Sequence, residues 1–300
     1  MFAPERLLIP VDFSGASTAA LRRGLDIAER TGAEVHVLHI VPGFAPVLGA
    51  DLDALPEEDQ AFFQRVWDRA DGELTALLHR EQATRVRRVL SFGLPSTVLL
   101  DYAQAQDVDL IVMGTHGRRG VRHALLGSVA EEVLRRAEVS VLVVPEAAAG
   151  RAPFFHVLVP TDFSLASRMA LPIAAEVADL YGAKLTLLHT LEPIPYLSML
   201  TGVTAGTDVS RLLREKAEVQ LHQLVANTNG ALARAETALV EGRAAEAVVA
   251  YADEHGVDAI VMAKHGLHGM ARFLVGSVTE RICRTAPCAV LVVPVDDDTA

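Results

Sequence analysis

A set of glycines in the first half of the sequence has the spacing of a phosphate-binding loop. Gly114 is followed by Gly117 after two residues, and by Gly127-Ser128 after nine more, directly before a helical stretch that begins around Val129. Glycines let the backbone approach a phosphate closely, and amides at a following helix N-terminus point at the anion with the helix dipole in favour. Ser128 offers its hydroxyl either to a phosphate oxygen or as the N-cap of that helix. The pattern predicts a site for a phosphorylated ligand.

Basic residues cluster inside this glycine pattern, although the chain as a whole is acidic. Arg118, Arg119, Arg122 and His123 lie within it, whereas the formal net charge of the 300 residues is −11. A polyphosphate needs such a local cluster, and a solvated loop that balances an acidic surface would have the same composition. An acidic chain without a basic stripe is a poor candidate for binding nucleic acid, because several phosphates must be neutralised at once. We therefore expect a small phosphorylated ligand and no nucleic acid.

The common phosphate-binding and hydrolase motifs of other classes do not occur in the sequence. There is no G-x-x-x-x-G-K-[ST] loop, no G-x-G-x-x-G after a first strand, no G-x-S-x-G elbow and no H-E-x-x-H helix. Cys283 and Cys288 are expected to be small buried hydrophobes, and a metal site of His265, His268 and Cys283 is an alternative that spacing alone supports. His39 and His189 lie at equivalent places near the end of an apolar strand, and we interpret both as core residues.

The two halves of the sequence repeat each other. Leu-Ile-Pro-Val-Asp-Phe-Ser at 8–14 recurs as Leu-Val-Pro-Thr-Asp-Phe-Ser at 158–164, and Val-Leu-Val-Val-Pro at 141–145 recurs at 290–294. A repeat of about 150 residues has the size of one domain. The repeat therefore predicts two domains, residues 1–147 and residues 152–296.

Within each half, short apolar runs alternate with longer amphipathic stretches, as in βαβ units on a parallel sheet. Runs such as Asp109-Leu110-Ile111-Val112-Met113 are apolar on both faces, which predicts a central sheet covered by helices on both sides. The expected strands are 7–11, 35–41, 85–91, 109–113 and 140–144, and then 154–160, 184–190, 234–240, 258–262 and 289–293. The expected helices of the first half are 16–31, 57–80, 95–106 and 124–137.

The second copy keeps only part of the glycine pattern. It runs Ala263-Lys264-His265-Gly266, nine residues, and then Gly276-Ser277, so that alanine replaces the first glycine and the basic cluster shrinks. Alanine is costly where φ is positive or where a backbone must be approached closely. Lys264 either supplies a compensating charge or fills the pocket. The second copy is therefore expected to hold the weaker site.

These motifs together resemble the universal stress proteins in their tandem-domain form. The resemblance covers nearly the whole chain twice and rests on Pro-Val-Asp-Phe-Ser at 10–14, Leu-His-Ile-Val at 38–41, Asp-Leu-Ile-Val-Met-Gly-Thr-His-Gly at 109–117, Leu-Leu-Gly-Ser-Val at 125–129 and Val-Leu-Val-Val-Pro at 141–145. It implies two tandem Rossmann-like domains of the adenine-nucleotide alpha hydrolase-like fold, each an α/β unit with a five-stranded parallel sheet of order 3-2-1-4-5. It also implies an intramolecular pseudo-dimer, in which Ser140–Val144 and Ala289–Val293 pair antiparallel, and leaves open a homodimer of chains.

The same resemblance implies that ATP binds in the first domain, with Mg²⁺ or Mn²⁺ on its phosphates. Carried over by position, the nucleotide-binding residues are Pro10, Val11, Asp12, Ile40, Val41, Met113, Gly114, His116, Gly117, Arg118, Gly127, Ser128 and Val129. The weaker second site would use Thr161, Asp162, Thr190, Ala263, Lys264, Gly266, Gly276, Ser277 and Val278.

The function expected from these observations is that of an ATP-binding stress-response protein, which acts as a nucleotide-dependent binding or regulatory module. Two alternatives stay open. One is a slow ATPase or phosphotransferase with His116 as the nearby base, and the other is a nucleotide-independent scaffold or small-ligand carrier that uses the apolar segment 193–200. The first residues, Met1–Leu7, lack the regions of a signal peptide, and no apolar run has the length of a membrane span, so we expect a cytoplasmic protein.

Overall fold

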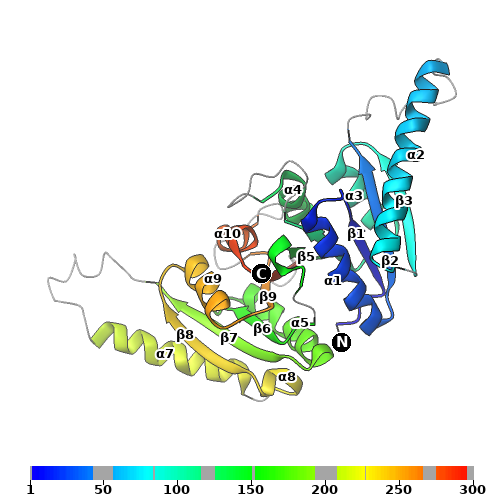
Figure 1. Ribbon diagram of the computed structural model, residues 1–300. Helices are drawn as coiled ribbons and strands as arrows, with labels where there is room; N and C mark the ends of the chain where they lie inside the picture. Colours follow the sequence, from blue (N-terminus) through cyan, green and yellow to red (C-terminus); the bar gives the residue numbers. More distant parts are fainter. Residues whose placement is uncertain are drawn as a thin grey trace. The chain divides into compact units, whose positions relative to one another are not determined.

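The structure is a computed structural model that describes residues 2–42, 57–83, 85–115, 126–150, 153–192, 208–226, 228–265 and 275–295. The chain forms two compact units, the first made of residues 3–152 and the second mainly of residues 153–300. Each unit is an α/β layer structure around its own parallel sheet, and the two are described in turn (Figure 1).

The first unit is built on five parallel strands in the order β3-β2-β1-β4-β5. Leu7, Leu8 and Ile9 on the central strand are fully buried, as are Leu110, Ile111 and Val112 on its neighbour. Helices cover both faces of a parallel sheet of this kind, so the side chains on both faces of its strands are buried. This burial explains the continuous apolar runs in the sequence. The strands are β1 Arg6–Pro10, β2 Glu34–Val41, β3 Val86–Phe92, β4 Leu110–Gly114 and β5 Ser140–Val144.

The helices of the first unit connect these strands by crossovers. Right-handed crossovers place helices on opposite faces when the chain reverses direction along the sheet, as it does between β3 and β4. Arg22, on the helix between β1 and β2, forms an ion pair with Glu81, which directly follows the helix between β2 and β3; Arg22 Nε lies 2.6 Å from Glu81 Oε2. The two later helices, before and after β4, contact each other. The helices are α1 Gly15–Thr31, α2 Glu57–Arg80, α3 Pro95–Ala105 and α4 Ser128–Arg136, followed by the short helix η2 Glu146–Ala148.

The second unit repeats this arrangement with the strand order β8-β7-β6-β9-β10, again all parallel. Its strands are β6 His156–Pro160, β7 Lys184–Leu191, β8 Glu236–Glu241, β9 Ala259–Ala263 and β10 Ala289–Val293. Its helices are α5 Leu165–Tyr181, α7 Asp208–Val225, α8 Gly230–Ala233, α9 Ala244–Glu254 and α10 Ser277–Thr285. The predicted fold class and the predicted strand order are confirmed in both copies.

The first helix of each unit begins and ends by the same local chemistry. The Ser14 hydroxyl accepts a hydrogen bond from the Ser17 amide at the start of α1, and Gly32 ends that helix in the left-handed conformation. In α5 the same roles belong to Ser164 and Gly182. A serine N-cap and a left-handed glycine are the favoured signals at these two ends. The equivalent positions therefore fix the direction in which each helix leaves its first strand.

A buried histidine lies where β6 begins in the second unit. His156 Nε2 is 2.9 Å from Thr186 Oγ1, and its Nδ1 is 3.3 Å from the His255 carbonyl oxygen. Because a carbonyl only accepts, Nδ1 carries the proton and Nε2 accepts from the Thr186 hydroxyl. Burial lowers the pKa of His156 below its ordinary value, so the neutral ring is favoured in the folded protein.

This histidine makes the stability of the second unit depend on pH. A lowered folded-state pKa means that the unfolded chain binds more protons below about pH 6.5, so the free energy of unfolding should decrease as the pH falls from there towards the folded-state pKa. One proton limits the slope to about 1.4 kcal/mol per pH unit. Urea unfolding between pH 5 and pH 8 measures it, and His156→Asn should remove part of the slope. An identical slope in that variant would assign the pH dependence to other groups.

Candidate functional site

Three of the predicted site segments meet at one edge of the first sheet. β1 lies between β2 and β4, so the carboxyl ends of these strands are neighbours, and the chain order reverses at this point. In open α/β sheets, ligands bind beyond the carboxyl ends of the strands at such a reversal. The residues that the structure brings to this edge are Pro10 at the end of β1 with Val11 and Asp12 directly after it, Ile40 and Val41 at the end of β2, and Met113 and Gly114 at the end of β4.

The start of α4 is fixed beside the end of β4. The Gly127 amide donates to the Thr115 carbonyl at 2.8 Å, and the Thr115 amide donates to the Val144 carbonyl at 3.2 Å. Gly127, Ser128 and Val129 therefore join the same edge of the sheet. The predicted site residues His116, Gly117, Arg118 and Gly266 lie outside the described residues.

Gly114 is required by the packing of α1 against β4. A Cβ atom at this position would lie 2.7 Å from the carbonyl carbon of Ala16 and 2.8 Å from the amide nitrogen of Ser17. These are backbone atoms, so a side chain here would displace the first turn of the helix. Gly114 is not among the described glycines with positive φ. A left-handed backbone is therefore not the reason for this glycine, and the close packing of α1 is a reason that the sequence did not indicate. The predicted close approach of a phosphate stays a prediction.

Gly127, rather than Ser128, is the N-cap of α4. Gly127 has φ −64° and ψ 144°, Ser128 is the first helical residue, and the cap makes no side-chain hydrogen bond. The capping role considered for Ser128 is therefore wrong, because the helix begins at Ser128 itself, one residue earlier than that role requires. Ser128 is exposed in the first turn. A helix start without a side-chain cap leaves its first amides to water or to another acceptor, and an anion is one acceptor that suits them.

The turn after β1 is held by a network of short hydrogen bonds. Asp12 Oδ1 accepts from the Ser14 amide at 3.1 Å and from the Ser14 hydroxyl at 2.6 Å, and the Asp12 amide donates to Ser17 Oγ at 3.3 Å. His39 Nδ1 lies 2.7 Å from the Val11 carbonyl oxygen. His39 is almost fully buried, so its interpretation as a satisfied core histidine is confirmed. Ser14 and Ser17 were not predicted as site residues, although the recurrence of Asp-Phe-Ser in both copies pointed to this turn.

The second unit has the same backbone hydrogen bonds at this edge of its sheet, but different side chains. The Lys264 amide donates to the Val293 carbonyl at 2.9 Å, and the Gly276 amide donates to the Lys264 carbonyl at 3.0 Å, as Thr115 and Gly127 do in the first unit. Lys264 is only 6% exposed, so this edge holds a buried lysine where the first unit has a threonine. The predicted residues Asp162, Ser277 and Val278 occupy the positions of Asp12, Ser128 and Val129.

Hydroxyl groups replace apolar ones in this second edge. Thr161 stands where the first unit has Val11, and its Oγ1 lies 3.0 Å from Ser167 Oγ. Ala263 is buried at the end of β9, and its carbonyl accepts from the Thr279 hydroxyl at 3.1 Å. Thr190 is half-buried near the end of β7. The two sites therefore share their backbone geometry but differ in the polarity of their walls.

The two cysteines are buried thiols. Burial raises the pKa of Cys283 to about 12, so the thiol is neutral and a poor metal ligand or nucleophile. No three His, Cys, Asp or Glu side chains of the described residues gather as a metal site, and His268 lies outside those residues. The interpretation of the cysteines as small buried hydrophobes is confirmed.

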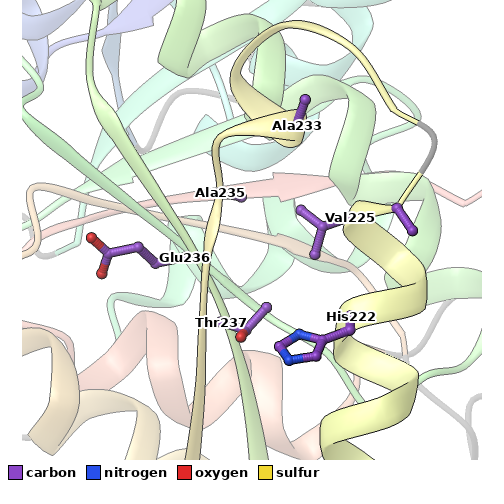
Figure 2. A pocket seen from close by; sticks show the side chains of 7 residues that line it. His222, Val225, Ala233, Ala235, Glu236 and Thr237 are labelled. Atoms are coloured by element: carbon purple, nitrogen blue, oxygen red, sulfur yellow. The ribbon is translucent and has the colours of Figure 1, made fainter.

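A cavity of about 650 Å³ lies away from this edge, between α7, α8 and β8. Figure 2 shows His222 and Val225 on the helix facing the strand, with Glu236 directed to the other side. Glu236 is paired there with Lys184, whose Nζ is 2.7 Å away. The cavity lies beside the start of β8 rather than its carboxyl end, and none of the described residues that line it is a lysine or an arginine. It does not have the groups that would bind a phosphate.

The fold and the carboxyl edge of the first sheet define a tandem α/β protein of the doubly wound class. A helix with a glycine N-cap begins at the point where the strand order reverses. The profile of the Universal stress protein family matches residues 4–145 and again residues 153–294. The chain belongs to the universal stress protein family.

Similar proteins extend over one or both units. Universal stress protein MJ0531 of Methanocaldococcus jannaschii is 31% identical over 148 residues, which are 47% of this chain and 81% of that protein. Universal stress protein Mb2028c of Mycobacterium bovis is 25% identical over 299 residues, which are 95% of this chain and 96% of that protein. The crystal structure of a universal stress protein from Archaeoglobus fulgidus is 20% identical, with a TM-score of 0.69 over 98% of this chain and 99% of that chain. The last likeness concerns the fold.

None of the helices in the described part of this chain is long and apolar enough to cross a membrane.

Proposed function

We propose that the first unit binds ATP at the carboxyl edge of its sheet and acts as a nucleotide-dependent regulatory module. The observation that carries this proposal is the start of α4, where a glycine N-cap without a side-chain bond stands beside the end of β4 at the reversal point. The exposed amides of a helix N-terminus suit a phosphate group, and the arginines that follow Gly117 in the sequence add charge for a polyphosphate.

The second unit supplies independent support for a ligand at this helix start. Gly276 is the N-cap of α10, with φ −59°, and a Cβ atom there would meet only ordinary contacts, the nearest being the Lys264 carbonyl oxygen at 3.5 Å. The fold does not need a glycine at this position, and glycine is a poorer cap than serine or asparagine. A ligand that lies close to the backbone would leave no room for a side chain at this position. Such a ligand would explain a glycine where the packing of the protein itself permits a side chain.

In this proposal the phosphates contact Gly127, Ser128 and Val129, and the adenine and ribose end lies towards Val11, Asp12, Ile40 and Val41. The described carboxylates form no metal cluster, so a Mg²⁺ or Mn²⁺ ion would be held mainly by the phosphates themselves. We further propose that the second unit binds nucleotide weakly or takes an altered ligand, since a buried lysine and an alanine stand at its edge. The cytoplasmic location and the association of chains stay predictions.

Calorimetry with MgATP tests this function. We expect one site per chain with a dissociation constant in the millimolar range or below, and a much weaker second site. Protein that carries no adenine nucleotide after purification, and that gives no binding heat with ATP, contradicts the proposal.

A further inference from the structure

The turn after the first strand of each unit has a backbone conformation that large side chains avoid. Phe13 has φ 65° and Phe163 has φ 64°, both in the left-handed region. For a bulky residue this conformation is an outlier, and it persists only where the surrounding structure determines it more strongly than the local preference does. Such outliers cluster at functional sites. The same outlier in both copies therefore needs a cause in the surrounding contacts.

A histidine of the neighbouring strand contacts this turn. The ring centroids of Phe13 and His39 are 4.4 Å apart, and His39 Nδ1 is 2.7 Å from the Val11 carbonyl oxygen. Because the carbonyl only accepts, Nδ1 donates, which fixes both the tautomer and the plane of the imidazole. One histidine thus contacts the residue before Asp12 through a hydrogen bond and the residue after it through its ring.

The second unit reproduces this arrangement closely. Phe163 and His189 have ring centroids 4.3 Å apart, and His189 Nδ1 is 2.7 Å from the Thr161 carbonyl oxygen. The contact is therefore a property of the turn and does not depend on whether valine or threonine precedes the aspartate. The second unit offers a matched control for each substitution in the first.

The opposite side of the turn is held by α1. The Ser14 hydroxyl, which donates to Asp12 Oδ1, also accepts from the Ser17 amide at 3.1 Å, so the cap of the helix and the aspartate share one serine. The Val11 amide donates to the Leu38 carbonyl at 2.9 Å and continues the pairing of β1 with β2. The segment Val11-Asp12 is therefore fixed on one side by hydrogen bonds to β2 and on the other by hydrogen bonds to the start of α1. Phe13, in its left-handed conformation, lies between these two sets of contacts in the sequence.

We propose that Phe13 and His39 are positioning residues for the nucleotide site. They hold Val11 and Asp12 in the conformation that the ligand meets, so that binding does not have to order the turn. This inference rests on the proposed function, because Val11 and Asp12 are contacts in that proposal whereas Phe13 and His39 are not. When a site is competent for only a fraction of the time, the measured dissociation constant rises by the inverse of that fraction.

The test compares the MgATP dissociation constants of single variants by calorimetry. Phe13→Asn keeps a residue type that tolerates the left-handed conformation and removes the ring, and His39→Leu removes the donor. If the turn is then competent about one tenth of the time, each variant should bind ATP about tenfold more weakly. Phe13→Tyr keeps the ring contact and should restore the wild-type affinity to within about twofold.

The matched variants Phe163→Asn and His189→Leu separate positioning from general stability. They remove the same contacts in the second unit, so they should cost similar stability in urea unfolding but leave the tight ATP site unchanged. Folded Phe13→Asn protein with the wild-type dissociation constant overturns the inference, even if His39→Leu fails to fold. Wild-type protein that binds no ATP overturns the proposed function together with this inference, which distinguishes the two failures.

Discussion

Replacing Gly114 with alanine is expected to lower the free energy of unfolding of the first unit by about 1–3 kcal/mol, because an added methyl group must displace tightly packed backbone. The methyl would lie 2.7 Å from the carbonyl carbon of Ala16 and 2.8 Å from the amide nitrogen of Ser17. Neither atom can move unless the first turn of α1 moves. Since that turn carries the network around Asp12, we also expect weaker ATP binding.

Urea unfolding and calorimetry on the same preparations measure both effects. The matched control is Ala263→Gly in the second unit, which removes a methyl group from the equivalent position and should leave the tight ATP site unchanged. If Gly114→Ala binds ATP with the wild-type affinity, then Ala263 ceases to be a reason for a weaker second site. The asymmetry between the units would then depend on Lys264 and Thr161 instead.

Replacing Gly127 with serine is expected to weaken ATP binding by about tenfold or more, equivalent to about 1.4 kcal/mol or more, without loss of stability. Serine is a better N-cap than glycine, so the helix should be unaffected or slightly stabilised, by a few tenths of a kcal/mol. The new side chain would accept from the first amides of α4 and occupy the position that the proposal gives to a phosphate. Stability and affinity therefore change in opposite directions, which general damage to the fold cannot produce.

Gly276→Ser in the second unit is the control for this substitution. A Cβ atom at Gly276 meets nothing closer than 3.5 Å, so the same cap is gained there without strain. We expect this variant to keep the tight ATP site and to abolish any weak second one. Unchanged ATP affinity in Gly127→Ser would show that the amides of α4 do not contact the phosphates.

The order and limits of the strands could be predicted from the sequence because each is a short apolar run between helical stretches. The expected strand at 35–41 is β2 at Glu34–Val41, and the expected helix at 57–80 is α2 with the same limits. Of the expected helix at 124–137, residues 126 and 127 are not helical and α4 begins at Ser128, whereas residues 124 and 125 lie outside the described residues. Local propensity does not place a boundary well when glycine rather than serine is the cap.

Other features depend on contacts between distant residues, and these carried no local signal. The short helix α8 begins at Gly230, which has φ 65°, and the Asp179 carboxylate accepts from the Ala231 amide at 3.1 Å. The need for glycine at Gly114 arises from a helix that is about a hundred residues away in the sequence. Phe13 is not a residue type from which a left-handed backbone is expected, and its conformation depends on the His39 ring beside it and on the hydrogen bonds between Asp12 and Ser14.

The proposed function depends most on one nucleotide site per chain, at the edge of the first unit. The direct measurement is equilibrium dialysis of the purified protein against MgATP at a concentration that saturates the tight site, which counts the adenine nucleotides bound per chain without removing free ligand. We predict one nucleotide in the wild type and a large loss in Gly127→Ser. A count near zero contradicts ATP binding, and a count near two contradicts the difference between the two units.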